Sequence, residues 1–156
     1  MNHVNLKMRY IVLLLTFLVL LQSSCNKETK YSNIPKLTYR GMDRFQIKAG
    51  DTGMVRIFIE FEDGDGNIGF GTENLFLKDS RDTVFVPFEI PEIDERYEPE
   101  NGLKGIIQVD YESAFLLLRS DSVHAERDTL FWEIYMKDEA KNESNRILTD
   151  FLILTK

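Results

Sequence analysis

The stretch that decides the fold is Met54–Phe70, MVRIFIEFEDGDGNIGF, in which an alternating apolar run ends in a loop of glycines and acids. One side of the extended run carries Val55, Ile57, Ile59 and Phe61. The positions between them, from Arg56 to Glu62, are charged except for Phe58. A period of two residues is the pattern of a strand with one buried face, so the run predicts a half-buried β-strand.

The loop after this run places side-chain oxygens at every second residue. Asp63, Asp65 and Asn67 supply them, and Gly64 and Gly66 lie between. Ca²⁺ takes about six to eight oxygen ligands on a tightly curved chain, and glycine permits the positive φ angles of such a curve. The loop therefore predicts a calcium site of the weak, extracellular kind, with a Kd on the order of 10⁻⁴ to 10⁻³ M.

A plain hairpin turn accounts for the same loop, because Asp-Gly between alternating hydrophobic runs is a strong hairpin signal. The loop also departs from the EF-hand pattern. Ile68 stands where that pattern needs glycine, and Asn74 occupies the twelfth position, with Glu73 one place early. The sequence leaves the calcium site and the simple turn as alternatives.

The N-terminus predicts an exported protein. Lys7 and Arg9 precede the apolar run Ile11–Leu21, which is shorter than the ~20 residues that a membrane-spanning helix needs. This is the pattern of a secretory signal peptide, predicted over residues 1–24. The six residues that end at Cys25, Leu-Leu-Gln-Ser-Ser-Cys, resemble the lipobox of bacterial lipoproteins, which implies cleavage before Cys25 and lipidation of its thiol. A soluble secreted protein cut near Ser24, or an uncleaved anchor, is the alternative.

Cysteine and charge exclude several classes of function. Cys25 is the only cysteine, so no thiol remains for a disulfide, a catalytic nucleophile or a zinc cluster. Without residues 1–24 the chain has 17 basic and 26 acidic residues, a net charge of −9. Such a surface argues against nucleic acid and against electrostatic binding to anionic lipid. Residues 25–36 are predicted to be the lipidated cysteine and a flexible tether, and residues 37–156 the folded domain.

Short alternating segments continue to the end of the chain, and no apolar stripe of helical period extends over ten residues. Pro87 lies in one of these strands and predicts a sheet edge, because proline cannot donate to a ladder. Ala114–Leu118 predicts either a buried strand or one helical turn. A closing strand is expected at Ile147–Leu154. In the other segments the residues expected to face inward are Phe45, Ile47 and Ala49; Val84, Val86, Phe88 and Ile90; Ile107, Val109 and Tyr111; and Leu130, Trp132, Ile134 and Met136. About seven short strands predict an all-β, antiparallel immunoglobulin-like β-sandwich, with a small barrel as the alternative.

Three features are weaker candidates for chemistry. The acids from Glu92 to Glu100 suggest a carboxylate-dependent glycan hydrolase, but clustered acids without an apolar pocket are typical of a solvated loop. His124 lacks a nucleophile and is interpreted as a surface residue. Trp132 is interpreted as a core residue because it is in phase with three apolar neighbours. No catalytic residue is assigned, and the chain is predicted not to be an enzyme.

Several motifs together resemble a family of Bacteroidetes cell-envelope lipoproteins of unknown function. They are the lipobox, the loop Asp63-Gly64-Asp65-Gly66-Asn67-Ile68-Gly69, the segment Asn74-Leu75-Phe76 and the stretch Asp138-Glu139-Ala140-Lys141-Asn142-Glu143-Ser144-Asn145. The resemblance implies an outer-membrane location. Lys27-Glu28 matches part of the surface-export signal of such proteins and slightly favours the outer surface over the periplasmic side.

An immunoglobulin-like sandwich also predicts a fuller calcium site. If Met54–Asp63 is strand B and the strand of Trp132 is strand F, the loops that follow them share one end of the sandwich. Asp138, and with it Asn142, is then expected near Asp63 and Asp65. The alternative is that Asp138 only begins a hairpin turn. The predicted function is a lipid-anchored, non-enzymatic binding or structural module, stabilised by calcium, whose partner is a glycan or a protein. A glycan hydrolase or a glycan-binding accessory protein is the alternative.

Overall fold

The computed structural model describes residues 31–69, 71–93, 102–119 and 126–156. Within these ranges the chain is all-β apart from one 3-10 turn, η2 (Ser113–Phe115). The described strands are β1 (Lys36–Met42), β2 (Gln46–Lys48), β3 (Met54–Asp63), β4 (Thr72–Asp79), β5 (Val86–Ile90), β6 (Leu103–Glu112), β7 (Arg127–Leu130), β8 (Trp132–Met136), β9 (Ile147–Leu148) and β10 (Leu152–Thr155).

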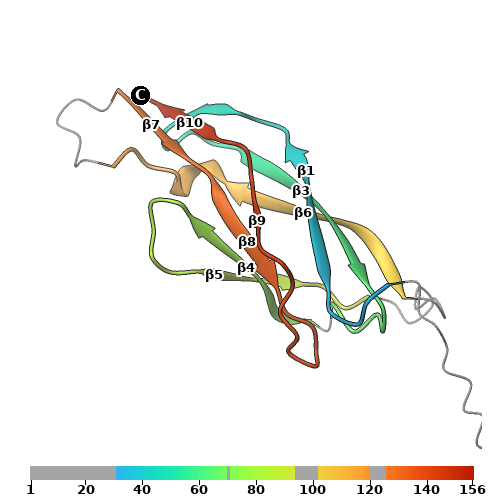
Figure 1. Ribbon diagram of the computed structural model, residues 1–156. Coiled ribbons are helices and arrows are strands. Elements are labelled where there is room, and N and C mark those ends of the chain that lie inside the picture. Colours follow the sequence, from blue (N-terminus) through green and yellow to red (C-terminus); the bar gives the residue numbers. More distant parts are fainter. Residues whose placement is uncertain (1–30, 70, 94–101, 120–125) are drawn as a thin grey trace, which may run out of the picture.

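The strands form three sheets in a sandwich-like arrangement (Figure 1). One sheet has the order β1-β3-β6, the second β2-β10-β7 and the third β5-β4-β8-β9. Neighbouring strands are antiparallel except for β2 and β10, which are parallel. The second and third sheets are continuous in the chain, because Phe131 alone separates β7 from β8.

The core lies between the sheets. The alternating face of β3 is fully buried, with Val55, Ile57 and Ile59 at 0% exposure, as the sequence predicted. Trp132 is 1% exposed, and its ring lies 5.2 Å from that of Tyr111 across the core, so its prediction as a core residue is also confirmed. Pro87 lies in β5, which is an edge strand as expected.

Several local predictions were wrong. The first strand is β1, whose Leu37 and Met42 are buried, whereas Phe45 is 51% exposed. Val84 lies before β5 and Val86 is its first residue, and both are exposed, so the buried face of this strand begins later than the alternation predicted. For Ala114–Leu118 the helical-turn alternative is correct. The expected closing strand is divided into β9 and β10, since the chain changes sheets between them.

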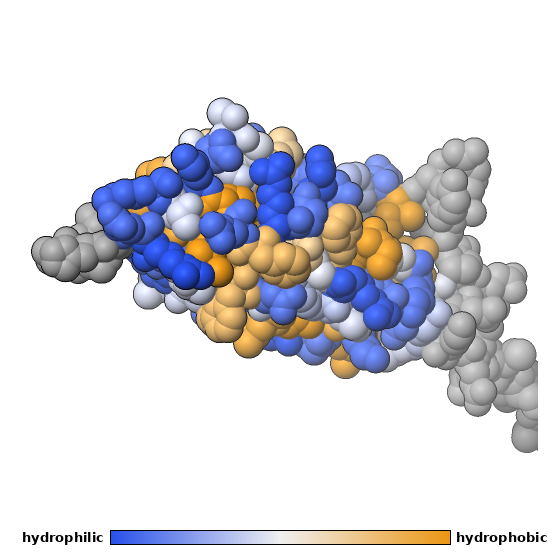
Figure 2. All heavy atoms as spheres, turned by 90° about the horizontal axis from the view of Figure 1, so that it is seen from above, coloured by the Kyte–Doolittle hydropathy of each residue, from blue (hydrophilic) through white to orange (hydrophobic). Residues whose placement is uncertain are grey.

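On one face of the molecule, apolar and hydrophilic residues are interspersed. Figure 2 shows the face seen from above in Figure 1, where apolar residues form clusters separated by hydrophilic ones. Phe151 is an exposed apolar residue; it is 63% exposed and packs edge-on against Phe131 with ring centroids 5.6 Å apart. Scattered exposure of this kind is normal for a folded domain.

Candidate metal centre

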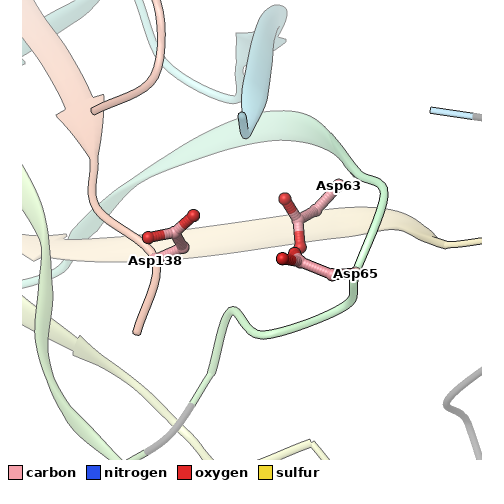
Figure 3. A group of neighbouring side chains, drawn as sticks. All are labelled: Asp63, Asp65 and Asp138. Carbon is pink, nitrogen blue, oxygen red and sulfur yellow. The ribbon is translucent and has the colours of Figure 1, made fainter. Parts of the chain in front are cut away.

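Two loops meet at one end of the sandwich and bring three carboxylates together (Figure 3). Asp63 ends β3, Asp65 lies two residues further along the same loop, and Asp138 follows β8. Carboxylate oxygens of the three residues all lie within 4.8 Å of one another. The expected proximity of Asp138 to Asp63 and Asp65 is therefore observed.

Backbone hydrogen bonds hold the two loops against each other. β4 pairs with β8, with Leu75 opposite Met136, so the chain entering β4 runs beside the chain leaving β8. The amide of Lys137 donates to the carbonyl of Asn74 at 2.8 Å, and the amide of Glu139 donates to the carbonyl of Asn67 at 3.0 Å. The position of the cluster is thus fixed by the sheet and not by the acids themselves.

Asp138 is held in place by its own turn. Its carboxylate accepts the backbone amide of Asn142 and the side-chain amide of Asn142, each at 2.7 Å. Lys141, between them, has a φ of 68°, which completes the tight turn. Asp138 is 1% exposed, and each of its oxygens keeps a lone pair free for a further ligand. Asn142 therefore positions the Asp138 carboxylate by donating two hydrogen bonds to it.

Asp63 is the unusual member of the cluster. It is 0% exposed, and neither of its carboxylate oxygens accepts a hydrogen bond of normal geometry from a described residue, although the amide of Gly66 is near enough to lower its pKa in part. The side-chain oxygen of Asn67 is also buried without a hydrogen-bond partner among the described residues. A buried, unpaired carboxylate is unfavourable by several kcal/mol, so native proteins normally pair such a group or bind a cation there.

Burial, followed by the Asp65 carboxylate, raises the pKa of Asp63 to about 7, and the charge of Asp138 acts in the same direction. Near neutral pH, the chain without a cation is forced either to keep a proton on Asp63 or to bury a negative charge beside another. A bound cation removes both penalties, because it stabilises the ionised form of every carboxylate in the cluster.

The cluster fits a calcium ion. Calcium lies about 2.3 to 2.6 Å from its oxygen ligands, so two ligands on opposite sides of one ion are at most about 5 Å apart. The three carboxylates meet this limit. The buried side-chain oxygen of Asn67, two residues beyond Asp65 in the same loop, is a further candidate ligand, and water would complete the shell.

The remaining EF-hand positions serve other purposes. Ile68 is 2% exposed and belongs to the core, which explains why the loop lacks glycine there. The side-chain oxygen of Asn74 accepts the amide of Ile90 at 3.0 Å, so it ties β4 to β5 instead of facing an ion. Neither contact has a signal in the sequence, because both depend on which strands become neighbours.

A buried acid with a raised pKa beside a second carboxylate is also the arrangement of an acid–base pair. Asp63 is fully buried, however, and offers no surface to a substrate. Of the other acids proposed for hydrolysis, Glu92 is exposed. Residues 94–101, His124 and Cys25 lie outside the described residues, so those predictions stay predictions.

Comparison with models of known protein families, with curated proteins and with solved structures finds no match to this chain. In the part of the chain that the structure describes, no helix has the length and apolar character needed to cross a membrane. The case for a function therefore depends on the site and on the sequence patterns.

Proposed function

We propose that this chain is a lipid-anchored, non-enzymatic β-sandwich protein of the bacterial outer membrane, and that calcium stabilises the loop end of its domain. One observation carries the calcium part of the proposal: the buried Asp63 carboxylate, inside a cluster of three carboxylates, accepts no hydrogen bond of normal geometry from a described residue. A cation shared by Asp63, Asp65, Asn67 and Asp138 would tie the β3–β4 loop to the loop after β8.

The anchor and the location are supported by the sequence alone. Residues 1–24 have the pattern of a signal peptide, and the residues up to Cys25 resemble a lipobox. Two or more acyl chains give stable membrane attachment, whereas one holds only marginally. The proposal keeps an immunoglobulin-like topology, which is supported by the loops after β3 and β8 sharing one end of the sandwich.

The test is thermal unfolding of the full chain in lipid nanodiscs, with EDTA and then with excess Ca²⁺. The fluorescence of Trp132 is a suitable signal, because it is the single tryptophan and is buried in the core. Calcium is expected to raise Tm in the wild type and to have no effect in Asp63→Asn or Asp138→Asn. An unchanged Tm in the wild type would reduce the cluster to a turn.

A glycan-binding accessory protein is the second candidate, favoured by an aromatic cluster around β4 and β8. Phe76 stacks on Tyr135 with ring centroids 4.8 Å apart, and Phe85 meets Tyr135 edge-on. Lys137 and Arg146 lie over these rings. Aromatic faces beside cations suit an acidic sugar. Binding of a uronic-acid polysaccharide that is lost in Phe76→Ala would support this candidate, and equal binding by the variant would remove it.

A further inference from the structure

The two edges of the β1-β3-β6 sheet are treated differently. At the β1 edge, Asn145 closes the sheet: its side-chain oxygen accepts the amide of Leu37 at 2.8 Å and its side-chain amide donates to the carbonyl of Leu37 at 3.0 Å. The Asn145 side chain thus satisfies the two backbone groups of Leu37 that a neighbouring strand would otherwise satisfy. At the opposite edge lies β6, and no strand of the described ranges pairs with its outer side.

The free edge of β6 is long and regular. Its residues pair with β3 from Leu103 to Glu112 without a bulge, and the strand contains no proline. Proteins usually protect such an edge by a bulge, a proline or a covering segment, because a flat unpaired edge is a template for another strand. β5, the edge strand of the facing sheet, is a poorer template, because Pro87 lacks an amide donor.

A groove of about 470 Å³ runs along these two edges. Its walls are residues 88–93, in and after β5, and residues 106–110 of β6, and both sets are consecutive in the chain. Side chains of successive strand residues point to opposite faces of a sheet. A groove lined by every residue in turn therefore follows the edge of the strand, where main-chain groups are presented, and does not lie over one face.

The lining has one sign of charge. Phe61 and Leu75 contribute to an apolar floor, and the charged members of the lining are Glu89, Glu92 and Asp110. Asp110 also lies 3.9 Å from the Arg56 guanidinium and accepts the side-chain amide of Gln108 at 2.7 Å, so its charge is partly balanced. No lysine, arginine or histidine is among the described residues that line the groove. The amide of Ile93 donates to the carbonyl of Gly69 at 3.0 Å, so the end of the wall beyond β5 is fixed to the β3–β4 loop.

We propose that this groove binds an extended segment of a partner protein, which pairs with β6 as an added strand. Every second side chain of the segment enters the apolar floor, and the side chains between them are basic and face Glu89, Glu92 and Asp110. Strand addition uses main-chain hydrogen bonds for affinity and alternate side chains for specificity. A second copy of this chain is the less suitable occupant, because edge-to-edge pairing would bring two acidic rims together.

The test uses an acetylated seven-residue peptide, Lys-Val-Lys-Val-Lys-Val-Lys-amide, and a matched peptide with glutamate in place of lysine. The full chain is held in phosphatidylcholine nanodiscs, so that no free detergent occupies the groove, and empty nanodiscs supply the blank. By calorimetry at low salt, the basic peptide is expected to bind about tenfold or more tightly than the acidic one. Amide hydrogen exchange is expected to slow over residues 105–111 and to stay unchanged in β1.

The matched variants separate the groove from overall charge. Glu89→Lys with Asp110→Lys is expected to weaken the basic peptide about tenfold or more. Asp51→Lys with Glu126→Lys changes the net charge equally at exposed acids outside β6 and the groove and should leave binding near the wild-type value. Each of three results would overturn the proposal: equal effects of the two double variants, peptide binding without protection of β6, or a dimer in light scattering whose β6 is protected without peptide.

Discussion

Replacing Asp63 by asparagine is expected to change stability in opposite directions with and without calcium. The change keeps the size and shape of the side chain and removes its charge. In the absence of a cation it removes an unfavourable buried carboxylate, so the variant should be more stable than the wild type. In the presence of calcium it removes a ligand, so the stabilisation by the ion should be lost.

The magnitude follows from the pKa of Asp63, which burial raises from 3.8 to about 7. Each pKa unit corresponds to about 1.4 kcal/mol, so after a discount for partial screening the ionised group costs roughly 2 to 4 kcal/mol in EDTA above pH 7. For a domain of this size that is a rise in Tm of roughly 5 to 15 °C for Asp63→Asn. The sign is set by the raised pKa: the penalty is absent below about pH 4, grows as pH rises, and is complete above pH 7.

The assay is thermal unfolding followed by Trp132 fluorescence, at about pH 8 and about pH 4, in EDTA and in calcium. Glu112→Gln, an exposed acid outside the cluster, is the control for the loss of one negative charge. Calcium at ten to a hundred times Kd should stabilise the wild type by about 1.4 to 2.7 kcal/mol and should leave Asp63→Asn unchanged. The reasoning fails if Asp63→Asn is destabilised in EDTA at pH 8, because Asp63 would then be a structural acceptor.

Four further outcomes are expected. The calcium-induced rise in Tm should shrink between about pH 8 and pH 5, because binding must then displace the proton of Asp63; an equal rise at both values would contradict the raised pKa. Asn145→Ala should lower the free energy of unfolding by about 1 to 3 kcal/mol in urea, since it leaves the amide and carbonyl of Leu37 unpaired, and a neutral effect would mean that water replaces them. Arg81→Ala should cost about 3 kcal/mol, because the mostly buried Asp79 loses its partner at 2.7 Å; an effect below 1 kcal/mol would show that the pair is solvated. Cys25→Ser should lack the acyl mass on intact-protein mass spectrometry and leave the membrane fraction, and retention there would point to an uncleaved anchor.

The sequence predicts the strands with a complete apolar face and fails at the ends of shorter alternating segments. The alternating apolar residues of 55–61 and of 130–136 are buried as expected. Phe45 and Val84 follow the same local pattern, yet they lie just before β2 and β5 and are exposed. Alternation shows that a segment is extended and two-faced, but the position of a strand within its sheet depends on long-range pairing that the pattern does not contain.

The candidate site was predictable in part for the same reason. The approach of Asp138 to Asp63 follows from the assumption that loops after two core strands share one end, which needs only the class of fold. The complete burial of Asp63 and the clamp of Asn142 on Asp138 needed the actual register, in which Leu75 lies opposite Met136. The environment of the Asp63 side chain, and with it the raised pKa of Asp63, depends on how β4 and β8 pair.

The loop after β8 connects the candidate metal centre to strand β1. Asp138, at the start of this loop, lies beside the carboxylates of Asp63 and Asp65. Asn145, at its end, is hydrogen-bonded to Leu37 of β1, the edge strand of the β1-β3-β6 sheet. Between them Ser144 binds Met136 twice, through its backbone amide and its hydroxyl. An ion bound at Asp138 would therefore also restrain the segment that contacts β1, whereas no described strand pairs with the outer side of β6. The loop after β8 thus reaches one edge of the sheet, and the strand-binding groove is proposed at the opposite edge.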